Sequence, residues 1–435
     1  MTATALGMTG LATLVVLLAL RVPVAVALIG VSAVGLWQLL TLDASVGVLA
    51  TAPFEFTSSW TLSAVPMFLL MGYICFYSGM TTSLFDLAKA VLAKVPGALA
   101  IASVVGCTGF ATVCGSSIAC AAAMGRIAIP EMVRAGYGRD FACGAVAAGG
   151  TIGALIPPSI VLILFGIFAQ VSIIDLFLGG IGVGLLTALG YISVILWTSW
   201  RNPHIVPRSL PSVPPGAIMA NLKQMWPLLL LVFGVFGGLF AGIFTTTEAG
   251  AAGAALAFII AAAQGRLNRS LLIKSLTETV VTCGSLFIVG VGAVMFTRFV
   301  SISGAGGLIS SFVIGWDLSY WELMLVVVVI YLILGMFIDG IGAMLLTLPI
   351  FLPILDAQNI NLVWFGVFLA KLIEIGMLTP PFGLNVFVIK SVVGNLTTLT
   401  GVFRGVMAFI LVDMVVILLC IAFQDIVLFF PMLGR

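Results

Sequence analysis

The chain has 435 residues, of which 62% are hydrophobic and only 7% are charged, and its net charge is +2. Soluble domains carry about 25% charged residues, so this composition excludes an ordinary soluble fold. No basic tract or zinc spacing supports a nucleic-acid partner. The single histidine, His204, argues against histidine-based catalysis and histidine metal clusters. The composition therefore indicates a protein that works within the lipid bilayer.

Apolar stretches follow one another along the chain, and roughly ten to thirteen of them could cross or re-enter a membrane. Eight predicted full crossings are residues 5–20, 23–40, 62–79, 173–200, 226–244, 250–264, 277–297 and 404–430. Four stretches are interrupted by glycine, proline or polar residues, namely 98–130, 141–168, 320–353 and 362–390. The long hydrophilic segment 201–223 is rich in proline and predicts a linker between two halves.

Basic residues occur in five groups that predict the orientation of the chain. They are Lys89 and Lys94; Arg134 and Arg139; Arg201, Arg208 and Lys223; Arg266, Arg269 and Lys274; and Lys390 and Arg404. Segments 42–60 and 356–361 contain no lysine or arginine. If the basic groups are cytoplasmic, residues 98–130 enter and leave on that side, and residues 320–353 on the opposite side. Two hairpins would then reach inward from opposite faces.

The interrupted stretches also match each other in sequence. The matched features are Ile152-Gly153 with Ile375-Gly376, Pro157-Pro158 with Pro380-Pro381, Pro130 with Pro353, Ile127 with Ile350, and Ser116 with Asp339. One offset, the 223 residues from Gly153 to Gly376, serves every pair. Unrelated hydrophobic helices would not place glycine and proline in step, so the offset indicates a duplication. With the charge pattern it predicts an all-α polytopic membrane protein built as an inverted repeat, with two re-entrant hairpins and two broken helices.

The breaks are the predicted sites of chemistry. A Pro-Pro pair removes two backbone donors and disfavours helix just before it. Freed carbonyls at membrane depth are tolerated only against protein or a watery cavity, and they can coordinate a cation or accompany an anionic substrate. A structural kink is the alternative interpretation of either break. Two repeat-related breaks, each paired with a polar hairpin tip, favour a binding role.

At the hairpin tips, Ser116 and Ser117 supply uncharged oxygens suited to Na⁺, although serines also serve as helix-packing residues. Asp339 at the second tip is an intramembrane carboxylate, which is costly unless it faces water, a partner or an ion. Thr379, just before Pro380-Pro381, is a further ligand candidate. Thr151, the counterpart of Glu374 in the first repeat, is a weaker one.

Three charged residues keep alternative interpretations. Lys371 and Glu374 lie three residues apart on one helix face, so a neutralising pair is the simpler interpretation and a functional contact the alternative. Arg298 ends a predicted helix on the non-cytoplasmic side. Its side chain either extends to the membrane interface or attracts an anionic substrate.

The predicted division of the chain has five parts. They are N-terminal scaffold helices (1–97), the first hairpin and broken helix (98–172), central scaffold helices (173–319) with the linker 201–223, the second hairpin and broken helix (320–398), and a C-terminal helix (399–435). The second and fourth parts together form the predicted transport domain.

Two long runs resemble one known family. The first run, residues 114–166, reads CGSSIACAAAMGRIAIPEMVRAGYGRDFACGAVAAGGTIGALIPPSIVLILFG. It resembles the large membrane subunit of tripartite ATP-independent periplasmic (TRAP, DctM-like) transporters. The second run extends from LILGMFIDGIGAMLLTLPIFLPIL through IEIGMLTPPFGLNVFVIK. It resembles the matching half of that family. The resemblance implies an elevator-type secondary transporter coupled to Na⁺, a separate small four-helix membrane subunit, and a periplasmic substrate-binding protein. It also implies a multi-pass location in the bacterial inner membrane.

The resemblance further implies particular site residues. A first sodium site would use Ser116, Ser117, Thr151, Gly153 and Pro157, and a second Asp339, Gly340, Gly342, Gly376, Thr379 and Pro380. The substrate would lie between the tips, with Ser116, Asp339 and Arg298 as candidate contacts. The second tip reads Asp-Gly where the family often has a hydroxyl after the aspartate.

The function expected from these features is sodium-driven import of a small organic anion, such as a C4-dicarboxylate or a sugar acid, delivered by a binding protein. Neither an organic cofactor nor a nucleic-acid partner is expected. The sequence contains no G-x-x-x-x-G-K-[ST] motif, so the energy would come from a gradient. A stand-alone ion-coupled carrier is the nearest alternative, and a channel is a more distant one. An intramembrane enzyme is disfavoured because no nucleophile–base pair or metal cluster is visible.

Overall fold

The computed structural model describes residues 2–207, 216–316 and 318–433. These residues form α-helices joined by short turns, with three short 3₁₀ helices and no strand among them. Six of the described helices are long and apolar enough to cross a membrane, or up to seven if one bent pair counts as a single span. Helices satisfy their backbone hydrogen bonds internally, as hydrocarbon surroundings require. The predicted all-α polytopic class is therefore confirmed.

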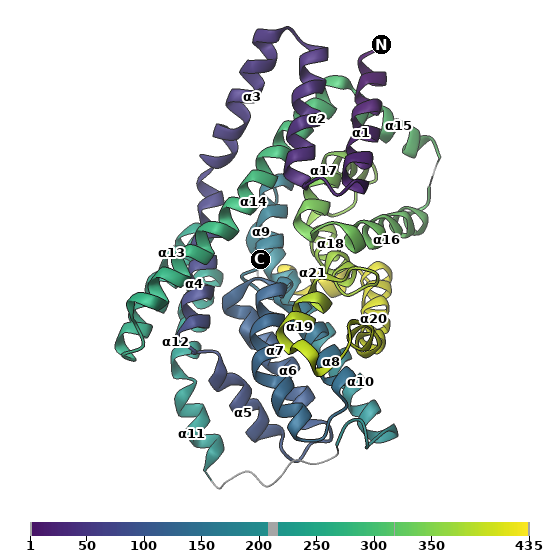
Figure 1. Ribbon diagram of the computed structural model, residues 1–435. Helices are drawn as coiled ribbons and strands as arrows, with labels where there is room; N and C mark the ends of the chain where they lie inside the picture. Colours follow the sequence, from purple (N-terminus) through teal and green to yellow (C-terminus); the bar gives the residue numbers. More distant parts are fainter. Residues whose placement is uncertain (1, 208–215, 317, 434–435) are drawn as a thin grey trace.

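The N-terminal part differs in detail from the sequence prediction. It consists of α1 (Ala3–Ala19), α2 (Val24–Leu39), α3 (Leu42–Thr57), the 3₁₀ helix η1 (Trp60–Ser63) and α4 (Ala64–Tyr77). The first two were predicted as full crossings, yet α1 and α2 have only 17 and 16 residues. That length is at or just below the lower limit of about 17 residues for a span. They pack together as a hairpin at one end of the molecule (Figure 1).

The helices outside the two hairpins and their breaks include one very long helix. They are α5 (Thr82–Leu92), α10 (Ile173–Arg201), α11 (Ala217–Gln224), α12 (Trp226–Phe240), α13 (Thr246–Ala263), α14 (Arg269–Ser303) and α15 (Ala305–Gly315). With 35 residues, α14 is about 52 Å long and runs obliquely through the molecule in Figure 1. It packs on α2, α3 and α4, and α4 also packs on α13. The start of α13 is fixed by a capping box in which Thr245 and Glu248 satisfy each other's backbone N–H groups.

Two hairpins and two broken helices occupy corresponding positions. The first set is α6 (Ala98–Cys114), α7 (Ser117–Arg134), α8 (Arg139–Thr151), η2 (Ile152–Ala154) and α9 (Ile160–Ala169). The second is α16 (Tyr320–Phe337), α17 (Gly340–Ala357), α18 (Leu362–Gly376), α19 (Leu384–Val393) and η3 (Gly394–Leu396). Helices α7 and α17 begin at Ser117 and Gly340, which are 223 residues apart, and they end with the same separation. The element boundaries therefore follow the repeat offset found in the sequence.

Each hairpin tip is built from residues suited to ending one helix and starting another. Gly115 ends α6 in the left-handed region at φ 63°, which glycine adopts at little cost. Ser116 then caps α7, because its side chain accepts a hydrogen bond from the Ala119 N–H. At the second tip the Asp339 carboxylate accepts a bond from the Gly342 N–H at 3.4 Å and caps α17.

The basic segments meet at one end of the molecule, at which α5 and α11 also lie in Figure 1. Gly97 and Gly138 donate backbone hydrogen bonds to Pro207 and Ile205, which brings the loops after α5, α7 and α10 together. Arg139 donates to the Leu396 carbonyl and so adds the loop after α19. This shared end is what the positive-inside pattern predicts. Arg208 and the prolines at 211, 214 and 215 of the predicted linker lie outside the described residues.

The C-terminal segment is not the single helix that the sequence predicted. The structure has α20 (Leu399–Ala422) followed by a separate α21 (Asp425–Leu433). The helix ends where Phe423, with an extended backbone, precedes the polar residues Gln424 and Asp425. Helix α21 then packs against α10 and α18. The predicted crossing 404–430 is therefore wrong at its C-terminal end.

Candidate functional site between the hairpin tips

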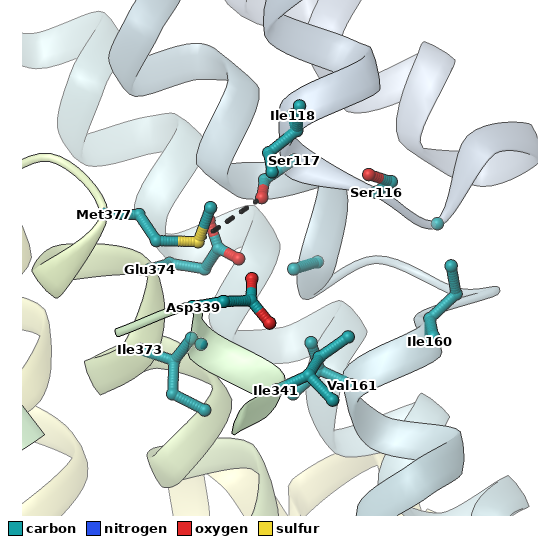
Figure 2. A pocket seen from close by; sticks show the side chains of 13 residues that line it. Ser116, Ser117, Ile118, Ile160, Val161, Asp339, Ile341, Ile373, Glu374 and Met377 are labelled. Carbon is teal, nitrogen blue, oxygen red and sulfur yellow. Dashed lines mark hydrogen bonds between the residues drawn. The ribbon is translucent and has the colours of Figure 1, made fainter. Parts of the chain in front are cut away.

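A cavity of about 60 Å³ lies where the two hairpin tips meet (Figure 2). Its lining residues come from both repeats: Gly115, Ser116, Ser117, Ile118, Ala154, Ile160, Val161, Asp339, Gly340, Ile341, Ile373, Glu374 and Met377. The space is enough for an ion and a few water molecules. The sequence analysis expected the substrate between these tips, and the structure brings the tips together there.

The first tip is seated directly on the first helix break. A Cβ atom added at Gly115 would overlap the carbonyl oxygen of Pro158, and the Gly115 carbonyl accepts a hydrogen bond from the Ile160 N–H at 3.4 Å. Gly153 is equally close, because a Cβ there would lie 3.0 Å from the Ser116 carbonyl oxygen. Pro157 is buried beside this contact region. Four of the five residues predicted for the first sodium site, all except Thr151, therefore lie in one region.

Ser117 connects the first tip to the second repeat. Its hydroxyl lies 3.9 Å from the Met377 sulfur and faces the carboxyl group of Glu374 (Figure 2). Glu374 is only 1% exposed, and its Oε2 atom has no hydrogen-bond partner in the described part of the chain. A buried oxygen of this kind is costly unless a ligand satisfies it.

The ionisable side chains of the cavity lining are all acidic. Asp339 and Glu374 face the same space from the second tip and from α18, and the lining includes no lysine, arginine or histidine. Hydroxyl and carboxylate oxygens together form a donor set for a hard cation such as Na⁺. No group of three or more His, Cys, Asp or Glu residues that could hold a metal occurs among the described residues. The lining can therefore offer oxygen ligands to a cation.

Other predicted ligands of the second sodium site do not line this cavity. Gly376 packs against α16, where a Cβ would lie 2.7 Å from the Gly335 Cα. The Thr379 hydroxyl donates to the Ile375 carbonyl at 2.7 Å, and Pro380 is exposed. Gly342 serves as the capping donor to Asp339. Of that predicted set, Asp339 and Gly340 alone contribute to the lining.

Two further predicted residues have their own partners. Thr151 is fully buried, and its hydroxyl contacts the Ala148 carbonyl at 2.6 Å and the Tyr191 hydroxyl at 3.2 Å. Arg298 forms an ion pair with Glu55 of α3 and lies within 3.3 Å of the Thr51 hydroxyl. The structure thus places Arg298 at the contact between α3 and α14, outside the cavity lining.

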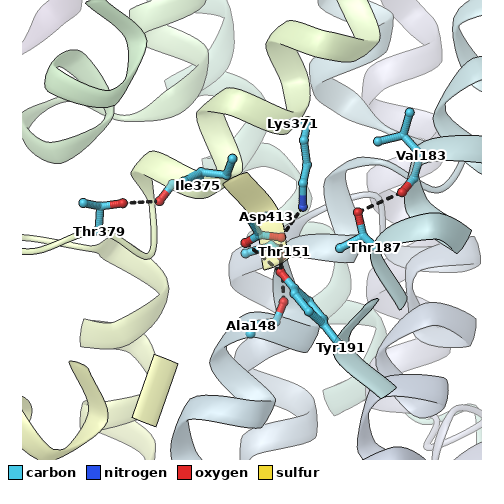
Figure 3. Close-up of polar contacts among 9 residues, drawn as sticks. All are labelled: Ala148, Thr151, Val183, Thr187, Tyr191, Lys371, Ile375, Thr379 and Asp413. Atoms are coloured by element: carbon cyan, nitrogen blue, oxygen red, sulfur yellow. Dashed lines mark hydrogen bonds and ion pairs between the residues drawn. The ribbon is translucent and has the colours of Figure 1, made fainter. Parts of the chain in front are cut away.

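The expected Lys371–Glu374 pair is wrong. The Lys371 ammonium group pairs instead with Asp413 of α20 at 2.5 Å, and both side chains are buried (Figure 3). Tyr191 of α10 donates to the same carboxylate, at 2.7 and 2.8 Å from its two oxygens. Asp413 and Tyr191 were not among the residues predicted from the sequence. Asp413 could have been found as an acidic residue inside an apolar stretch, because a buried carboxylate requires a partner.

The chain matches a known family over most of its length. Residues 11–426 match the family model described as "Tripartite ATP-independent periplasmic transporter, DctM component". The chain belongs to the DctM family. The predicted family resemblance is therefore confirmed, and so is the expectation of a multi-pass membrane protein.

Two curated relatives of this DctM family member are transporter permeases. The C4-dicarboxylate TRAP transporter large permease protein DctM of Pseudomonas aeruginosa is 37% identical over 80% of this chain and 82% of its own length. The isethionate TRAP transporter permease protein DctMQ of Oleidesulfovibrio alaskensis is 33% identical over 86% of this chain, which spans 59% of that longer protein. Because the relatives are permeases, the prediction that this chain is not an enzyme is confirmed.

A solved structure supports the fold. The YdaH transporter of Alcanivorax borkumensis superposes with a TM-score of 0.63 and covers 95% of this DctM chain and 99% of its own, at 16% sequence identity. At that identity the likeness concerns the fold alone. It agrees with the all-helical architecture described above.

Proposed function

We propose that the chain is the large membrane subunit of a TRAP transporter that imports a small organic anion together with sodium ions. The observation that carries this proposal is the cavity between the hairpin tips. Two carboxylates and two serine hydroxyls line it, and one buried carboxylate oxygen has no partner among the described residues. We expect a space of this kind to bind a cation before it binds an organic anion.

The same charge accounts for coupling. An organic anion entering beside Asp339 and Glu374 meets like charge, and bound sodium ions remove that repulsion. Each ligand then improves the binding of the other, which is the thermodynamic requirement for coupled transport. The proposed sodium ligands are Ser116, Ser117, Gly153 and Pro157 in the first repeat. In the second they are the tip at Asp339–Gly340, which lines the cavity, and the break between Gly376 and Pro380, whose two end residues lie outside the cavity lining.

The proposed movement is of the elevator type. Helices α6, α7 and α8 pack on one another and α20 packs on α8, while α14 packs on α2 and α4, and α4 on α13. The two sets meet where α4 contacts α6. In the proposed movement, the set that contains α6, α7, α8 and α20 moves together with the second hairpin as one body. This body carries the cavity and slides against the set that contains α2, α4, α13 and α14. This assignment corresponds to a transport domain and a scaffold.

The proposed partners are a small four-helix membrane subunit and a periplasmic substrate-binding protein. The longer DctMQ relative supports a membrane partner, because this chain covers only 59% of it. The proposed substrates are C4-dicarboxylates, sugar acids or similar small anions. The names of the two relatives, which specify a C4-dicarboxylate and isethionate, support this class.

Reconstitution tests the proposal. The ligand of the partner binding protein is identified by thermal-shift screening and then supplied in radiolabelled form to proteoliposomes. We expect uptake only when all three proteins and an inward sodium gradient are present, and none when choline replaces sodium. Accumulation of free ligand by this chain alone would favour a stand-alone carrier, and single-channel currents would favour a channel.

A further inference from the structure

Lys371 and Glu374 lie three residues apart on α18, but their side chains contact different parts of the protein. Glu374 lines the cavity, whereas Lys371 is held by Asp413 of α20. Residues at this spacing on a helix are neighbours, and a lysine and a glutamate so placed ordinarily pair. Glu374 is also the only acidic residue within α18. What needs explanation is why its charge is not neutralised by the adjacent lysine.

The contacts around Asp413 supply the reason. Its carboxylate receives Lys371 at 2.5 Å and Tyr191 at 2.7 and 2.8 Å, and the Tyr191 hydroxyl also contacts Thr151 at 3.2 Å (Figure 3). All four side chains are fully buried. They come from α8, α10, α18 and α20, so the position of the lysine is fixed by three other helices.

We propose that Asp413 is a positioning residue that sets the cation affinity of the cavity by holding Lys371 away from Glu374. The proposal rests on the proposed function, in which the cavity binds sodium. Lys371, Asp413, Glu374 and Asp339 together carry two net negative charges, and the pairing with Asp413 leaves both of them in the cavity. If Asp413 is neutral, Lys371 pairs with Glu374 and its ammonium group competes directly with the sodium ion.

Sodium binding to the purified chain in nanodiscs tests this without any organic substrate. ²²Na⁺ binding is measured for the wild type, Asp413→Asn, and the double variant Lys371→Met/Asp413→Asn. We expect Asp413→Asn to raise the sodium Kd at least tenfold, because Glu374 gains an internal counterion. We expect the double variant to return the Kd to within about threefold of wild type, because the two cavity charges are free again. A purely structural role for Asp413 would give no such rescue.

The matched control is Glu55→Gln, which neutralises the acidic partner of a different ion pair, with Arg298, outside the cavity lining. Its Kd should stay at the wild-type value. An unchanged Kd in Asp413→Asn, or a folded double variant that remains weak, would overturn the proposal. The proposal would also be overturned if Asp413→Asn and Asp413→Thr both fail to fold while the double variant folds. That result would mean that Lys371 does not pair with Glu374 when Asp413 is replaced. Absence of sodium binding in the wild type would instead contradict the proposed function.

Discussion

The side chains predicted for the site divide into those that face the cavity and those engaged elsewhere. Ser117 faces Glu374 and Met377 across the gap between the repeats, whereas Thr151 and Arg298 already have protein partners. The Ser117 hydroxyl can donate its hydrogen to the Glu374 carboxylate, while its oxygen lone pairs remain available to a cation or a water molecule. Ser117 is therefore the tip residue with the clearest expected effect on sodium.

Replacing Ser117 by alanine should raise the sodium concentration for half-maximal uptake about tenfold. An interaction with a charged group contributes about 1.5–3 kcal/mol, and about 1.4 kcal/mol corresponds to a factor of ten. The measurement is the sodium dependence of uptake by the reconstituted transporter. Ser103→Ala is the control, because Ser103 is also buried in the first hairpin but bonds the Ala100 carbonyl. Equal sodium dependence in the two variants would remove Ser117 from the site.

At this scale the sequence predicted residue types better than partners. Ser116, Ser117 and Asp339 do meet at one cavity, because the repeat located the tips. Lys371 was assigned the wrong partner because Asp413 is 42 residues further along the chain, and local spacing carries no information about α20. The contact between α18 and α20 arises from tertiary packing, which local spacing in the sequence does not predict.

Among the elements, the hairpins and breaks owe their positions to glycine and proline, which act through backbone geometry. This is why they were predictable from sequence. The first tip shows the principle most directly, since Gly115 combines a left-handed backbone with contact against the Pro158 carbonyl. The ends of apolar helices depend on weaker signals, and the α20–α21 junction was accordingly missed.

Gly115→Ala should destabilise the chain and uncouple the first tip from its break. A left-handed alanine costs about 1–2 kcal/mol, and the overlap with Pro158 should add about 1–3 kcal/mol. Thermal unfolding of the purified protein and uptake would both report the change. Gly265→Ala separates the two terms, because Gly265 has a φ of 67° with no atom within 4 Å of an added Cβ. Equal losses in both variants would mean that the tip contact contributes nothing.

For the whole molecule, the orientation follows from where the basic loops gather. The loops near Gly97, Gly138, Pro207 and Leu396 are joined by hydrogen bonds at one end, and α1–α3 lie at the other (Figure 1). This arrangement could be anticipated from charge counts, since the rule acts on loops regardless of how the helices pack. The packing of the long, oblique α14 could not, because apolar composition does not specify tilt.

Cysteine labelling tests the orientation. Arg201→Cys should react with a membrane-impermeant maleimide only after the inner membrane is permeabilised, whereas Leu42→Cys should react from the periplasmic side. Both positions are exposed, whereas the seven native cysteines are buried and should react little with the maleimide. The opposite pattern would reverse the assignment of cytoplasmic and periplasmic faces.

The two Pro-Pro breaks share a sequence offset but differ in enclosure: Pro157 is buried, while Pro380 is exposed. The two copies of the predicted repeat thus meet unequal constraints. A substitution at the enclosed copy must be absorbed by a filled interior, whereas one at the open copy meets free space. Replacements at the second break should consequently be tolerated more easily than those at the first.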